Sequence, residues 1–156
     1  MWIQNTINHL VHHVQEAMAN KQDHVFIAKF DWAHGACGYI LLLLQAAQVL
    51  QQQSYLQQAA TLCEWMWDRP HQWSQRKLGL AFGSSSMAIC FLQLSKVCPK
   101  PTNLLWQRRA EYVLQGMIRD YKENLTFYGL YDGLGGLVSA ILQLHRKVVI
   151  QMPLYC

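Results

Sequence analysis

A histidine and a cysteine lie three residues apart at the start of the longest apolar run of the chain. In the segment WAHGACGYI, residues 32–40, His34 and Cys37 are accompanied by two glycines. An imidazole has an unperturbed pKa of about 6.5, so an exposed His34 could transfer protons near neutral pH. A metal ion needs more ligands than this pair provides. The pattern therefore favours a helix-entry turn around His34 and a small buried thiol at Cys37.

Two further polar segments do not match a catalytic motif. In HLVHHVQE, residues 9–16, which also contains His12, the residues His9, His13 and Glu16 lie close to one helical face, but the spacing differs from the HExxH of zinc proteases. We expect this histidine cluster to face solvent or a partner. The segment GSSS, residues 83–86, lacks the lysine of a phosphate-binding loop and the GxSxG elbow of a serine nucleophile.

The composition limits the class of protein. The chain has 156 residues, enough for one domain, and only 14% of them are charged, whereas 52% are apolar. Soluble domains usually carry about 25% charged residues, so much of the surface is expected to be buried in the fold or against a partner. The net charge is +4, but the basic residues form no stripe, which argues against nucleic-acid binding. The run YILLLL is too short for a membrane span.

The cysteines and the first residues indicate a cytoplasmic protein. The five cysteines are odd in number and include no CxxC pair, so reduced thiols are a simpler interpretation than a disulfide framework. The first thirteen residues, MWIQNTINHLVHH, have neither the basic nor the apolar region of a secretory signal.

An internal repeat is anchored by glycines. With Gly35, Gly83 and Gly133 in register, a small residue follows three positions on, a leucine nine on and a glutamine ten on. The three segments, which begin at residues 30, 78 and 128, are FDWAHGACGYILLLLQAAQVL, LGLAFGSSSMAICFLQLSKVC and YGLYDGLGGLVSAILQLHRKV. Four shared positions at fixed offsets are typical of a repeat fold built from stacked supersecondary units.

Each unit is predicted to be a helical hairpin. An amphipathic outer helix, expected at about 3–19, 55–67 and 104–119, precedes each anchor glycine, and an apolar inner helix follows it. The repeats then occupy about 1–50, 51–98 and 99–147 of a single all-α domain over 1–156. The tail KVVIQMPLYC remains ambiguous.

The turn before each inner helix is where the repeat gathers polar groups. We expect each anchor glycine to adopt a positive φ, which glycine tolerates. We expect the small residue three positions later to let a neighbouring helix approach closely. If the inner helices form a ring, the residues just before the anchors, His34, Phe82 and Asp132, face one end of it. A carboxylate at Asp132 would also favour the N-terminus of the following helix.

These motifs resemble those of the lanthionine synthetase C-like family. The segments WAHGACG, GLAFGSS and GLYDGLGG are similar to its motifs W-C-H-G-x-x-G, G-L-C-H-G-x-x-G and G-L-x-x-G-x-x-G, in the same order. The resemblance covers nearly the whole chain and implies an α/α-toroid. Since the full toroid has more hairpins than this sequence supplies, we expect a partial toroid of three hairpins, a truncated or degenerate member of the family.

The resemblance also implies a metal site whose ligands are changed here. In the family, a zinc ion held by the first two motifs activates a thiol, which adds to a dehydroamino acid to form a thioether. The family's ligands fall on Ala33, Ala81 and Phe82, none of which can bind zinc, so no cofactor is expected. His34 follows the first ligand position and remains as the candidate catalytic residue, with Phe82 and Asp132 as candidate substrate contacts.

The sequence therefore predicts a peptide- or partner-binding module that is not an active enzyme alone. The alternative is an active thioether-forming component completed by a partner chain. A carbohydrate-active α/α-toroid enzyme ranks lower, because only Asp31 and Asp132 could supply its carboxylates. A half ring leaves two open apolar ends, so we expect a protein partner or a homodimer.

Overall fold

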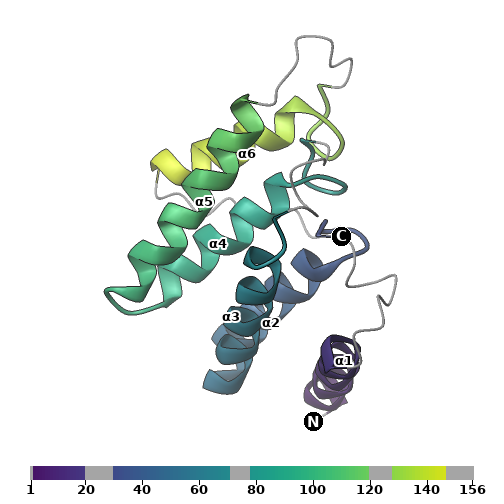
Figure 1. Ribbon diagram of the computed structural model, residues 1–156. Helices are drawn as coiled ribbons and strands as arrows, with labels where there is room; N and C mark the ends of the chain where they lie inside the picture. Colours follow the sequence, from purple (N-terminus) through teal and green to yellow (C-terminus); the bar gives the residue numbers. More distant parts are fainter. Residues whose placement is uncertain (1, 20–29, 71–77, 120–127, 147–156) are drawn as a thin grey trace.

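The computed structural model describes residues 2–19, 30–70, 78–119 and 128–146. These residues form six α-helices and no strand, so the all-α prediction is confirmed. The helices are α1 (Trp2–Ala19), α2 (Ala36–Leu50), α3 (Gln53–Trp67), α4 (Ser85–Val97), α5 (Thr102–Arg119) and α6 (Leu134–Arg146), as Figure 1 shows. The ambiguous tail from residue 147 lies outside the described residues.

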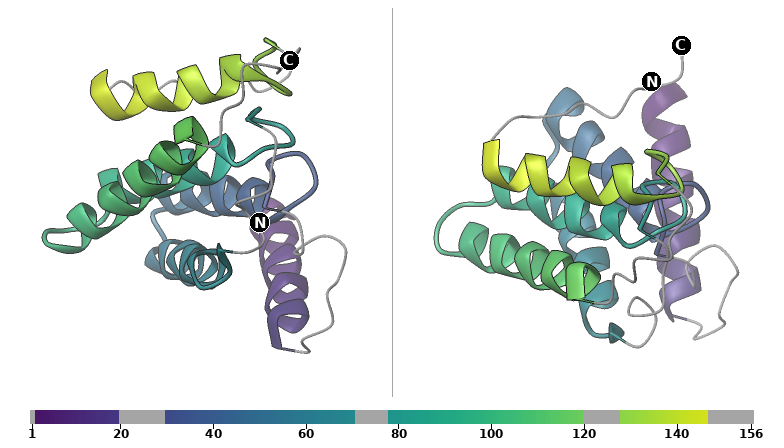
Figure 2. Two further views of the ribbon diagram at one scale, coloured as in Figure 1. Left: turned by 45° about the horizontal axis from the view of Figure 1, so that its top comes forward. Right: turned by 90° about the horizontal axis from the view of Figure 1, so that it is seen from above.

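The helices are arranged as a partial α/α-toroid-like array. Each inner helix packs mainly along the outer helix that follows it in the chain, α2 along α3 and α4 along α5. The inner helices α2, α4 and α6 are also neighbours, with α4 in the middle (Figures 1 and 2). Each predicted repeat range contains one outer and one inner helix, and each inner helix begins one or two residues after its anchor glycine.

The outer helices carry a second repeat, which the sequence analysis missed. The buried residues of α3 recur in α5 with the same spacing, 51 positions later. This spacing of four, three, one and three residues keeps the stripe on one helical face. The matched pairs are Tyr55 and Trp106, Ala59 and Ala110, Leu62 and Val113, Cys63 and Leu114, and Met66 and Met117.

An arginine joins the two outer helices α3 and α5. The Arg109 side chain is 13% exposed, and its guanidinium lies 4.9 Å from the ring centroid of Trp67 and 4.7 Å from that of Trp106. Its Nη1 donates to Glu64 Oε2 at 2.6 Å. Stacking on two aromatic rings and a short charge-assisted bond fix the spacing of the outer layer.

Helix α1 is packed less completely than the other outer helices. Ile7 and Val14 are buried, and the Tyr55 hydroxyl donates to Asn8 Oδ1 at 2.7 Å. A cavity of about 60 Å³ remains between α1, α2 and α3. It is lined almost entirely by apolar side chains, which include Leu10, Val11, Tyr39 and Leu42.

None of the described helices has the length and apolar character needed to cross a membrane.

Candidate functional site

The three turns that precede the inner helices meet at one end of the array, and we call this region the motif-loop end (residues 30–35, 78–84 and 128–133). Backbone hydrogen bonds join them in sequence. The Ala33 N–H donates to the Ala81 carbonyl oxygen at 3.1 Å, and the Ala81 N–H donates to that of Tyr131 at 2.8 Å. The Leu80 N–H donates to the Leu130 carbonyl oxygen at 3.1 Å. The repeat therefore gathers the three turns, as the sequence predicts.

Glycines permit this contact by close approach of backbones. A Cβ atom at Gly79 would lie 2.1 Å from the Tyr131 carbonyl oxygen, and one at Gly136 would lie 2.7 Å from the Leu80 nitrogen. The expected positive φ is wrong, because no glycine of the described residues has one and Gly35 is extended, with φ −142°. Glycine is required at Gly79 and Gly136 because the neighbouring backbone leaves no room for a side chain.

The second residue after each anchor glycine makes the same contact in all three repeats. Cys37 Sγ donates to the Phe30 carbonyl oxygen at 2.9 Å. In the second repeat Ser85 Oγ donates to the carbonyl oxygen seven residues earlier, that of Leu78. In the third, the Gly135 backbone N–H donates to Tyr128 at 3.3 Å. Cys37 is therefore part of the helix-entry turn, as the sequence favours.

Three candidate residues are exposed at the motif-loop end. The His34 and Phe82 rings are stacked, with centroids 5.5 Å apart and planes 21° apart. Asp132 is exposed on the third turn. The backbone hydrogen bond between Ala81 and Tyr131 joins the two turns that carry Phe82 and Asp132. The result is a surface that presents an imidazole, an aromatic face and a carboxylate.

The His34 turn is held by the carboxylate of Asp31. This side chain is 4% exposed, and its Oδ1 accepts a 2.7 Å hydrogen bond from the His34 backbone N–H. The bond satisfies a backbone donor in the turn that precedes α2, a local side-chain-to-backbone bond of the kind that Asp makes in turns. Asp31 therefore fixes the turn on which His34 is carried.

The positions that the resemblance matches to the family's zinc ligands lie at the motif-loop end, two of them exposed and one buried. Ala33 is exposed, Ala81 is buried, and the Phe82 side chain is 43% exposed. Among the residues that the structure describes, no group of three or more His, Cys, Asp or Glu side chains is placed to hold a metal ion.

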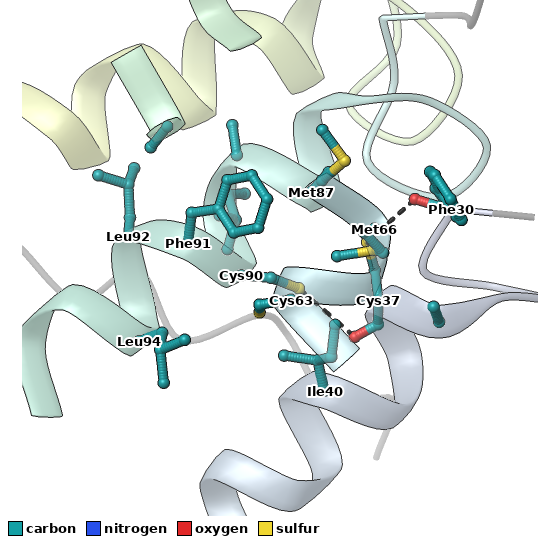
Figure 3. Packing of buried hydrophobic residues seen from close by; sticks show 14 of the residues in the cluster. Phe30, Cys37, Ile40, Cys63, Met66, Met87, Cys90, Phe91, Leu92 and Leu94 are labelled. Atoms are coloured by element: carbon teal, nitrogen blue, oxygen red, sulfur yellow. Dashed lines mark hydrogen bonds between the residues drawn. The ribbon is translucent and has the colours of Figure 1, made fainter. Parts of the chain in front are cut away.

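A cluster of thiols lies in the core beneath the motif-loop end, between α2, α3 and α4 (Figure 3). Cys37, Cys63 and Cys90 are fully buried and free. Cys37 Sγ lies 3.8 Å from Met66 Sδ, and Cys90 Sγ donates to the Cys37 carbonyl oxygen at 3.6 Å. Burial raises the pKa of Cys63 and Cys90 well above the usual thiol value, so both stay protonated and unreactive at neutral pH.

The histidine cluster of α1 is exposed to solvent, away from the thiols. His12 Nε2 lies 3.3 Å from Glu16 Oε1, and His13 Nδ1 lies 3.8 Å from Glu16 Oε2. The expectation of a surface cluster is confirmed.

Comparison with known proteins gives consistent matches. Residues 3–154 match the family profile described as Lanthionine synthetase C-like protein. The chain is 26% identical over 125 residues to Glutathione S-transferase LANCL1 of Danio rerio, which covers 80% of this chain and 30% of that protein. It is 30% identical over 133 residues to LanC-like protein GCL1 of Arabidopsis thaliana, which covers 80% of this chain and 29% of that protein. The chain thus spans less than a third of either relative, and no solved structure matched it.

Proposed function

Because the chain belongs to the lanthionine synthetase C-like family, we propose that it is a peptide- or protein-binding module of that family that does not form thioethers alone. The observation that carries the proposal is the content of the motif-loop end. The three positions that hold zinc ligands in the resembling motifs are Ala33, Ala81 and Phe82. Methyl groups and a phenyl ring offer no lone pair to a metal ion.

The same surface is suited to binding a peptide. Phe82 and His34 present stacked rings at the surface. Asp132 is exposed on the third turn, which the backbone bond between Ala81 and Tyr131 joins to the turn of Phe82. An exposed aromatic face next to a carboxylate binds apolar and cationic side chains through contact area, cation–π attraction and charge. The proposed ligand is therefore an extended peptide segment with an aromatic or basic residue.

A second candidate is a thioether-forming component completed by another chain. It is favoured by His34, which keeps the histidine of the first motif and is exposed beside the changed ligand positions. The similarity to a protein named as a glutathione S-transferase points to the same chemistry. In this alternative, His34 moves a proton during thiol addition, and the zinc ligands come from the partner.

Restoring the ligands tests the first proposal. We expect the variant Ala33→Cys, Ala81→Cys, Phe82→His to bind about one zinc ion per chain, because the backbone bond from Ala33 to Ala81 and the ring stack of Phe82 on His34 bring these positions together. The unchanged chain, purified without chelator, should contain no zinc by elemental analysis.

The same preparations distinguish the binding module from the thioether-forming component. Glutathione and a dehydroalanine-containing peptide are added to the unchanged chain with zinc, and mass spectrometry is used to detect a thioether adduct. Stoichiometric zinc or adduct formation by the unchanged chain alone would contradict the binding-module proposal.

We further propose a cytoplasmic location, because the described cysteines are all free thiols and a reducing compartment keeps them so.

A further inference from the structure

An apolar stripe is exposed on α6 at positions that are buried in α4 and buried or half-buried in α2. Val138 and Leu142 are 45% and 39% exposed. Their repeat equivalents in α4, five and nine residues after the anchor glycine, are Ala88 and Leu92, which are 0% and 3% exposed. In α2 the first of these positions is Ile40, which is also fully buried. The exposure is therefore a property of the end of the array.

At the opposite end of the array, α2 also exposes an apolar residue whose repeat equivalents are buried. Leu42 of α2 is 39% exposed, whereas the equivalent residues seven positions after the anchors, Cys90 of α4 and Ala140 of α6, are both fully buried. The two edges are thus Val138 and Leu142 on α6, which we call the trailing edge, and Leu42 on α2, which we call the leading edge.

The packing order explains why both edges are open. Each inner helix is covered mainly by the outer helix that follows it, α3 on α2 and α5 on α4. No helix of the described residues follows α6. At the other end, the described residues include no inner helix before α1, and α1 borders the 60 Å³ cavity that lies between it, α2 and α3.

We propose that the two edges belong to one interface, which a second copy of this chain completes. The trailing edge of each copy packs against α1 and the leading edge of the other. This contact would repeat a kind of packing that the chain already makes within itself, where the inner helices α2 and α4 lie along the outer helices α3 and α5 that follow them. Two copies make two such contacts, which close as a twofold dimer of six hairpins.

Mass in solution is the first test. Light scattering after size exclusion should give twice the chain mass of 18.1 kDa. Leu142→Glu should weaken the dimer at least about tenfold, because it buries a carboxylate in an apolar contact, and Val138→Glu should do the same. Val97→Glu is the matched control, since Val97 is 50% exposed at a position where Val49 of α2 is also exposed, away from both edges. A monomeric unchanged chain, or open-ended filaments, would overturn the proposal.

Complementation tests the head-to-tail arrangement. Leu142→Glu damages the trailing edge and leaves the leading edge unchanged. Leu42→Glu damages the leading edge, where Leu42 also lines the cavity beside α1, and leaves the trailing edge unchanged. Each variant alone therefore has two damaged contacts. A mixture of the two forms a pair in which one contact has both edges intact. We therefore expect the mixture to dimerise more tightly than either variant, with helicity by circular dichroism showing that both are folded. No gain on mixing would overturn the head-to-tail proposal in favour of a contact of α6 with α6.

Discussion

At the scale of single residues, equivalent positions of the repeat make the same hydrogen bond with different donor atoms. Cys37 carries a thiol and Ser85 the analogous hydroxyl, and each donates from its γ atom to the carbonyl oxygen seven residues earlier. Gly135 makes the bond with its backbone N–H. A cysteine beside a histidine attracts a catalytic interpretation, but its repeat partners show that its thiol holds a turn.

The buried thiols predict a loss of stability at alkaline pH. The pKa of Cys63 and Cys90 is raised in the folded state, mainly by burial, whereas an unfolded thiol ionises near pH 8.5. Their contribution is complete below about pH 8.5 and is lost as the pH rises towards the folded pKa. The free energy of unfolding in urea, measured under reducing conditions, should fall by up to about 2–3 kcal/mol between pH 8 and 9.5.

A variant that removes one thiol isolates this effect. Cys63→Ala should be less stable than the unchanged chain at pH 8 because it leaves a cavity, but its further loss by pH 9.5 should be about half as large. An equal loss in both proteins would show that these thiols do not cause the pH dependence.

At the scale of elements, the sequence predicts the helices well and their contacts poorly. The inner helices start at the anchor glycines, and the outer helices lie within two residues of the expected limits, because apolar periodicity is a local property. The positive φ expected at the anchors is wrong. The long-range constraint lies instead at Gly79 and Gly136, each of which lies against the backbone of another motif turn. The stacking of His34 on Phe82 depends on the same long-range contact.

Two glycines in different elements should respond oppositely to the same change. Gly79→Ala should destabilise the chain by several kcal/mol, about 3 or more, because its Cβ would overlap the Tyr131 carbonyl oxygen and push two motif turns apart. Gly116→Ala is the matched control in α5, where a Cβ meets nothing within 4 Å. It should stabilise the chain by about 0.5–1 kcal/mol, because alanine favours a helix.

Urea unfolding gives both free energies directly. The Gly79 variant should also lose the signal of the stacked motif-loop aromatics in near-ultraviolet circular dichroism. If the two variants were equally stable, the close approach of the turns would not contribute to the fold.

At the scale of the whole molecule, stability is expected to decrease from the middle of the array to its ends. Helix α4 contacts α2, α3, α5 and α6, and its residues from Ser85 to Leu92 are all buried. Within the described part of the chain, helix α1 packs through a short apolar stripe, has one side-chain hydrogen bond to α3, and borders a cavity. In repeat arrays each unit is stabilised by its nearest neighbours, so an end with one neighbour opens more easily.

Hydrogen exchange should therefore follow this order. In dilute protein, the amides of α1 should exchange first, those of α6 next, and those of α4 last, at the rate of global unfolding. Val14→Ala removes an anchor of α1 and should speed exchange in α1 alone, whereas Leu94→Ala creates a cavity beside fully buried neighbours and should speed exchange in every helix. Uniform exchange across the chain would mean that the array unfolds as one unit, and α1 would then be as firmly held as α4 in spite of the cavity beneath it.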